Sequence, residues 1–197
     1  MRERRPADWR VDLAERHPLE AEVAAALDAH PVLVRLSTWT ASCDRLDYQL
    51  LGPGERLCEL ELKAKRRPYQ GWSALRPGVE PVDLFILDEL ALRRIVDAGR
   101  YGFLLVRDMP GGRWALWSTA ELVLATKVRA GRRLATGVDR TKGKLLMDLA
   151  SAAAVTDTLA GALSELAALV GVIDRRWGDI APWPWQERDT WKKGEAS

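Results

Sequence analysis

Apolar and charged side chains alternate strictly from Cys58 to Lys65, and this stretch carries the residue types best suited to chemistry. The alternation has the period of a β-strand, so the charged residues share one face and the apolar residues share the other. The charged face consists of Glu59, Glu61, Lys63 and Lys65. Carboxylates and an ammonium that project together from a sheet can hold a divalent cation and a water molecule beside a phosphate. The pattern therefore predicts a strand with one buried face and one face suited to phosphate chemistry.

A second strand, over residues 45–51, is predicted to pair with the first as a hairpin. The intervening Gly-Pro-Gly at residues 52–54 is typical of a turn. Placing all apolar side chains on one side of the hairpin gives the register Leu50–Cys58, Tyr48–Leu60 and Leu46–Leu62. The same register sets Asp47 directly across from Glu61, so we expect their carboxylates to lie close together.

The elements that must position this hairpin are predicted from periodicity and end signals. Helices are expected over residues 19–29, 82–98, 118–127 and 151–173, and further strands over 32–39, 101–106 and 114–117. Residues 2–16 are predicted to form an irregular arm, residues 66–81 a loop and residues 145–149 a short apolar segment. Helices and strands therefore follow one another in an order that favours an α/β (α+β) architecture, with a mixed β-sheet flanked by helices.

An acidic residue on one strand, Glu-x-Lys on the next and a glutamate on the preceding helix resemble the PD-(D/E)XK nuclease superfamily. The matching residues are Asp47, Glu61 with Lys63, and Glu20, although no proline precedes Asp47. The resemblance implies a restriction-endonuclease-like core, ordered helix–three strands–helix–strand, which the elements predicted over residues 19–106 follow. It implies a nuclease-like core over residues 1–130. A C-terminal helical extension over residues 131–197 would pack on this core within a single domain.

The resemblance implies a Mg²⁺-dependent nuclease, with Mn²⁺ as a substitute, that hydrolyses phosphodiester bonds of nucleic acid, DNA rather than RNA. Repair, restriction and phage defence all use this fold. Asp47 and Glu61 would hold the metal, and Lys63 would orient or deprotonate the attacking water. Glu20 would help to position metal or water. Two alternatives stay open: an ordinary solvated strand face, or an inactive module of the same fold that binds nucleic acid or a protein partner.

Basic residues beside the Glu-x-Lys strand and in a later segment form a predicted track for a phosphate backbone. Tyr69 is included because an aromatic ring next to a basic run can stack on a base. The predicted nucleic-acid-binding residues are Lys65, Arg66, Arg67, Tyr69, Arg129, Arg132, Arg133, Lys142 and Lys144. The alternative interpretation is a solubilising surface of an arginine-rich protein.

Composition excludes several classes of protein. A hydrophobic content of 47%, a charged content of 29% and a net charge of +2 describe a globular chain whose overall charge says little about partners. The two cysteines give no disulfide framework, which favours a cytoplasmic location. The most apolar stretch, residues 152–173, contains Asp157 and Glu165, so we expect no membrane span there. The helix over 151–173 is instead a core helix or the interface of a homodimer.

Overall fold

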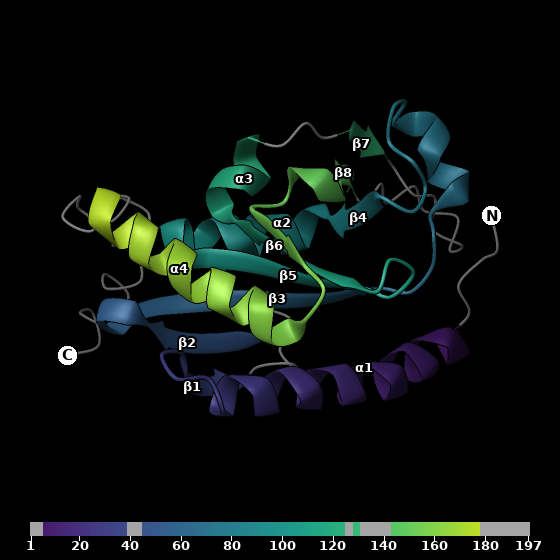
Figure 1. Cartoon of the computed structure of the whole chain (residues 1–197). Coiled ribbons are helices and arrows are strands. Elements are labelled where there is room, and N and C mark those ends of the chain that lie inside the picture. Colours follow the sequence, from purple (N-terminus) through teal and green to yellow (C-terminus); the bar gives the residue numbers. More distant parts are fainter. Residues whose placement is uncertain (1–5, 39–44, 125–127, 131–142, 178–197) are drawn as a thin grey trace, which may run out of the picture.

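The computed structural model describes residues 6–38, 45–124, 128–130 and 143–177, and its strands form two sheets (Figure 1). The larger sheet runs in the order β1 (Val34–Thr38), β2 (Tyr48–Gly52), β3 (Arg56–Lys65), β5 (Gly102–Asp108), β6 (Arg113–Ser118) and β9 (Ala154–Thr156). The smaller sheet runs in the order β4 (Leu84–Asp88), β8 (Lys144–Asp148) and β7 (Val128–Ala130). The α-helices are α1 (Pro6–Asp28), α2 (Glu89–Asp97), α3 (Thr119–Leu124) and α4 (Leu159–Trp177).

The larger sheet is covered on both faces, as Figure 1 shows. Helices α1 and α4 pack on one face, where the first core includes Val23, Tyr48, Leu60, Leu62, Phe103, Leu163 and Val170. Helices α2 and α3 and the smaller sheet pack on the other face, where the second core includes Phe85, Ile95, Leu104, Val106, Trp117, Leu122 and Met147. The charged face of β3 therefore lies beneath α2 and not in open solvent.

The sheet is mixed, as the sequence predicts, although most of its pairs are antiparallel. β3 and β5 run parallel, and the chain crosses between them through β4 and α2. The neighbouring pairs β1/β2, β2/β3, β5/β6 and β6/β9 are antiparallel. The observed order places one helix before three strands and a second helix before the parallel strand, with β4 added in the crossover.

The predicted β2/β3 hairpin forms, and its register is confirmed at two pairs. Leu50 lies opposite Cys58 and Tyr48 lies opposite Leu60. Gly54 takes a φ of 69°, a left-handed conformation that glycine adopts without steric penalty, so the predicted turn is also confirmed. The predicted place of Leu46 is wrong, because the ladder ends at Tyr48 and Leu46 lies in the second core, on the other face from Leu62.

The predicted helix over residues 82–98 is wrong in its first half. Residues 84–88 form strand β4, which pairs with β8, and α2 begins only at Glu89. The run Leu-Phe-Ile-Leu fits both patterns at this length, and pairing with a strand distant in sequence decides between them. The end of the helix is as predicted, since Gly99 follows with a φ of 72°.

Two other helix boundaries differ from the prediction. α1 begins at Pro6, so most of the predicted arm is helical, and the helix continues through Pro18. α4 begins at Leu159 and not at Ser151, because residues 154–156 form β9. Thr158 caps the helix, since its hydroxyl accepts a hydrogen bond from the Gly161 N–H at 3.0 Å.

Residues 143–177, the described part of the chain after residue 131, belong to the body of the fold. β8 and β9 are strands of the two sheets, and the apolar stripe of α4 fills the first core. The apolar character of this stretch suggested a homodimer through residues 151–173, and the burial of its apolar side chains in the protein's own core accounts for that character without a second copy. Among the described helices, none has the length and apolar character that crossing a membrane requires.

Candidate active site

Glu61 is a buried carboxylate at the centre of β3, facing α2. Only 1% of its surface is exposed. Its Oε1 accepts hydrogen bonds from the Lys63 ammonium and, at 3.2 Å, from Nη2 of Arg94. Its Oε2 is buried and accepts no hydrogen bond from the described residues. A buried carboxylate oxygen without a donor is uncommon in native proteins and marks a place where a ligand can bind.

Asp47 lies beside this carboxylate, just before β2 begins. It is 3% exposed, and its Oδ2 accepts a hydrogen bond from the Leu62 N–H at 2.8 Å, beyond the last backbone pair of the hairpin. Burial raises the pKa of Glu61, the Asp47 carboxylate adds to this rise, and the charges of Lys63 and Arg94 oppose it. The fold thus brings together the three residues of the predicted strand site.

Arg94 is a member of this cluster that the sequence analysis missed. It lies on α2, and its side chain is 21% exposed. Besides Glu61, it contacts the backbone carbonyl of Arg45, which accepts from Nη1 at 3.3 Å. The signal in the sequence was its spacing, because Arg94 follows the buried Ala91 by three residues and so shares the sheet-facing side of α2.

Close packing holds α2 against the sheet where Arg94 projects. Gly102 at the start of β5 has no side chain, and a Cβ there would lie 2.3 Å from the carbonyl oxygen of Ile95. The Thr119 hydroxyl donates in the same place, to the Gly99 carbonyl at 2.7 Å. These contacts bring the C-terminal end of α2 close to the start of β5.

The carboxylates of the cluster are of the chemical type that binds hard cations such as Mg²⁺. No set of three or more His, Cys, Asp or Glu side chains arranged to hold a metal occurs within the described residues. Mg²⁺, however, commonly uses one or two protein carboxylates and takes its other ligands from water and substrate phosphate. Asp47 and Glu61 supply two carboxylates, and the unbonded Oε2 of Glu61 supplies a donor atom.

Glu20, the predicted helix carboxylate, lies on α1, which packs on the opposite face of the sheet. Its Oε2 is 3.6 Å from Nδ1 of His17, and its backbone carbonyl accepts from the Tyr48 hydroxyl at 2.8 Å. Only 8% of its surface is exposed. Its role at the metal site stays a prediction.

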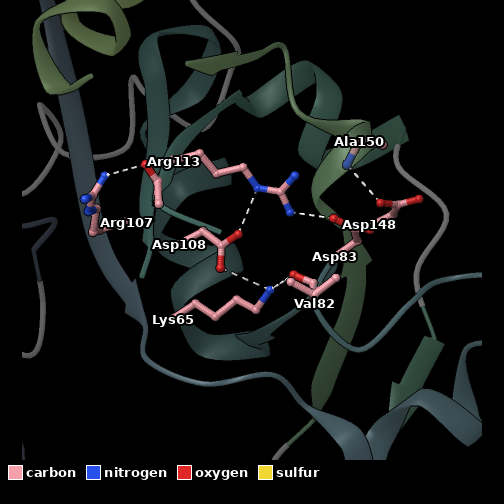
Figure 2. Close-up of polar contacts among 9 residues, drawn as sticks. Lys65, Val82, Asp83, Arg107, Asp108, Arg113, Asp148 and Ala150 are labelled. Carbon is pink, nitrogen blue, oxygen red and sulfur yellow. Dashed lines mark hydrogen bonds and ion pairs between the residues drawn. The ribbon is translucent and has the colours of Figure 1, made fainter. Parts of the chain in front are cut away.

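Lys65 was predicted to bind nucleic acid, and this prediction is wrong because the residue is completely buried. Its ammonium lies 3.2 Å from Oδ1 of Asp108 and donates to the Val82 carbonyl (Figure 2). Nε of Arg113 donates to the other Asp108 oxygen at 2.8 Å, and Nη2 donates to Asp83. We call Lys65, Asp108, Arg113 and Asp83 the closed cluster.

The remaining basic candidates divide into three groups. Arg66 and Arg67 are exposed directly after β3, and Tyr69 is half-buried. Lys144 is held in an ion pair with Asp88 and keeps 16% of its side chain exposed. Arg132, Arg133 and Lys142 lie outside the described residues, as does the side chain of Arg129.

A cavity of about 370 Å³ borders the closed cluster and not Glu61. Its lining includes Asp83 and Arg113, whose charged groups are paired with each other, together with Asp148. The Asp148 carboxylate accepts from the Ala150 N–H at 2.8 Å, also drawn in Figure 2. Asp83, Arg113 and Asp148 at this cavity therefore already have partners within the fold.

Comparison with known proteins found no matching family model, no matching curated protein and no matching solved structure. The assignment of this site therefore depends on its geometry and on the resemblance of its residues.

Proposed function

We propose that this protein is a metal-dependent nuclease with a PD-(D/E)XK-type site on the β2/β3 hairpin. Asp47 and Glu61 are the proposed metal-binding carboxylates, Lys63 is the proposed catalytic lysine, and the substrate is nucleic acid, with DNA as the first to test. The observation that carries the proposal is the buried Glu61, whose Oε2 is unbonded among the described residues while Asp47 and Lys63 lie beside it.

The arrangement of elements supports the proposal. The candidate residues lie at the start of β2 and along β3, on a face covered by α2, and β3 has a parallel neighbour reached through that helix. This agrees with the order helix–three strands–helix–strand that the resemblance implies. The alternative of a solvated strand face is disfavoured, because Glu61 and Asp47 are 1% and 3% exposed.

The chemistry of each residue follows from its position. A bound Mg²⁺ would activate a water and neutralise charge on the phosphate. Lys63, whose ammonium contacts Glu61 and whose side chain is 29% exposed, can reach water and substrate from the edge of the site. There it would orient the attacking water and stabilise the negative charge that develops during phosphodiester cleavage. Arg66 and Arg67, exposed just beyond β3, are placed to contact the phosphate backbone.

The test is cleavage of labelled single- and double-stranded DNA and RNA by the purified protein with Mg²⁺ or Mn²⁺. Lys63→Ala should lower the cleavage rate about a hundredfold or more, the usual size of a lost electrostatic stabiliser. The fold should survive, because Lys63 lies on the face away from Leu60 and Leu62.

The matched control is Arg93→Gln, which removes a positive charge 67% exposed on α2. It should cleave at the wild-type rate. Metal-dependent cleavage that persists at full rate in Lys63→Ala would place the chemistry elsewhere. Binding of nucleic acid without cleavage under any of these conditions would favour an inactive module of the same fold.

A further inference from the structure

The guanidinium of Arg94 joins the two chain segments that carry the candidate metal-binding carboxylates. Nη2 donates to Oε1 of Glu61 on β3 at 3.2 Å, and Nη1 donates to the backbone carbonyl of Arg45 at 3.3 Å. Arg45 precedes Asp47 by two residues, and both lie before Tyr48, the first residue of β2 that pairs with β3. Arg94 therefore holds this stretch of chain to β3 at a point that the backbone ladder does not reach.

The same contact also orients the Glu61 carboxylate. Both donors to this side chain, Lys63 and Arg94, bond to Oε1, while Oε2 is buried and accepts no hydrogen bond from the described residues. A carboxylate held by one oxygen presents the other oxygen in a fixed direction. Groups that hydrogen-bond to a metal-binding carboxylate in this way commonly set its orientation and the affinity of the site.

We propose that Arg94 is a positioning residue that fixes Glu61 and the segment bearing Asp47 in the geometry that a small octahedral cation requires. This inference rests on the proposed metal site and adds to it the source of its geometry. We call the pair of contacts, to Glu61 and to the Arg45 carbonyl, the Arg94 clamp. The guanidinium of Arg94 is planar and carries several donors, so it can make both contacts at once, whereas a lysine ammonium is a single point of charge.

Geometry can be separated from charge by comparing two ions of equal charge. Mg²⁺ demands near-ideal octahedral coordination at about 2.1 Å, whereas Ca²⁺ accepts longer and less regular arrangements. Removing the positive charge of Arg94 changes the attraction of the site for both ions in the same direction, and this effect largely cancels in the ratio of their dissociation constants. Loss of positioning does not cancel, because Mg²⁺ suffers more from it.

The experiment is calorimetric titration of the full-length protein with MgCl₂ and with CaCl₂, without nucleic acid. In Arg94→Gln the Mg²⁺ dissociation constant should rise about tenfold, the lower end of the usual effect of losing such a partner. The Ca²⁺ dissociation constant should rise less, so the ratio of the Mg²⁺ to the Ca²⁺ dissociation constant should increase. Arg94→Lys should shift the ratio in the same direction, because it keeps the charge and loses one of the two contacts. Arg93→Gln, one position away and 67% exposed, should keep the wild-type ratio.

Circular dichroism of each variant verifies that it is folded, and Arg94→Lys provides the test if Arg94→Gln does not fold. A wild-type ratio in Arg94→Gln overturns the inference and leaves the metal site standing. A shifted ratio in Arg94→Gln with a wild-type ratio in Arg94→Lys also overturns it, because the two contacts of the guanidinium would then not be required. Absence of binding of either ion to the wild-type protein contradicts the proposed function itself.

Discussion

Two charged clusters are built on the same face of β3, one around Glu61 and the other around Lys65, and they differ in how completely their polar groups are bonded. In the closed cluster, Asp108 forms an ion pair with Lys65 through one oxygen and with Arg113 through the other, and Arg113 also forms an ion pair with Asp83 (Figure 2). At Glu61 both described donors meet one oxygen, and the second oxygen has none. Oδ1 of Asp108 accepts no hydrogen bond from the described residues either, but it lies 3.2 Å from the Lys65 ammonium. Among the described residues, each oxygen of Asp108 therefore has a cationic partner, whereas both cationic partners of Glu61 lie at Oε1.

The difference also appears in what each cluster connects. The closed cluster joins β3, β5 and β6 to the segment before β4, so it ties the larger sheet to the smaller one. The cluster at Glu61 joins β3 to α2 and to the chain before β2, and Lys63 at its edge is 29% exposed. Burial also lowers the pKa of Lys65 in the closed cluster, so a shifted pKa alone does not separate the two clusters. The pairing separates them, because fully paired buried ions are typical of structural networks, whereas a buried carboxylate oxygen without a partner needs a specific explanation.

The largest effect on stability is expected from Asp108→Asn. This change keeps the shape of a side chain with no exposed surface and removes the negative charge between Lys65 and Arg113. Leaving a buried lysine without its carboxylate should lower the free energy of unfolding by about 3–5 kcal/mol. Urea denaturation at neutral pH measures this loss.

The matched control for Asp108→Asn is Asp157→Asn, which removes an exposed carboxylate and should change stability by less than about 0.5 kcal/mol. Adding Lys65→Met to Asp108→Asn should recover part of the loss, because the unpaired charge is then removed as well. A loss below about 1 kcal/mol in Asp108→Asn would mean that the closed cluster is not structural and would weaken the comparison.

The sequence predicted the hairpin well because its evidence was local. Strict alternation and a Gly-Pro-Gly turn determine the register up to the pair Tyr48–Leu60. Asp47 lies beyond that pair, and its side chain is held to β3 by the Leu62 N–H. The alternation placed Lys63 and Lys65 on the same face of the strand, so both were predicted to face the substrate, Lys63 in catalysis and Lys65 in nucleic-acid binding. Lys65 is buried only because Asp108, distant in sequence, is its neighbour on the parallel strand β5.

Long-range pairing also explains the other differences. Residues 84–88 and 154–156 became strands because β8 and β6 lie beside them, and no local signal specifies those partners. Arg94 entered the site through the packing of α2 on the sheet, which spacing along the helix suggests and only the tertiary structure decides. The sequence therefore predicted which charged residues share a face of a strand. It did not predict which of them belong to the candidate site and which to the closed cluster.

Glu61→Gln should have a much smaller effect on stability than Asp108→Asn. Burial raises the pKa of Glu61, so the fold disfavours the ionised form that the unfolded chain carries at neutral pH. Glutamine keeps an oxygen that can accept from Lys63 and Arg94 and removes the buried charge. At pH 8 in EDTA, the free energy of unfolding should stay within about 1 kcal/mol of wild type or exceed it. A loss as large as that expected for Asp108→Asn would make Glu61 part of the scaffold.

The smallest effect, and the most specific one, is the pH dependence of the difference in free energy of unfolding between Glu61→Gln and wild type. Because the pKa of Glu61 in the folded protein lies above its ordinary value of 4.5, the folded state holds more protons on this group than the unfolded state does between the two values. Stability contributed by Glu61 must therefore fall as pH rises through this window, and it must level off above the raised pKa. Below the ordinary value the group is protonated in both states and adds no pH dependence to the free energy of unfolding.

Urea titrations of wild type and Glu61→Gln in EDTA should thus show the variant gaining stability relative to wild type as pH rises from about 4. The opposite trend, with wild type gaining on the variant over this range, would mean that Lys63 and Arg94 outweigh burial. Glu61 would then resemble the paired carboxylate of the closed cluster, and the contrast between the two clusters would fail.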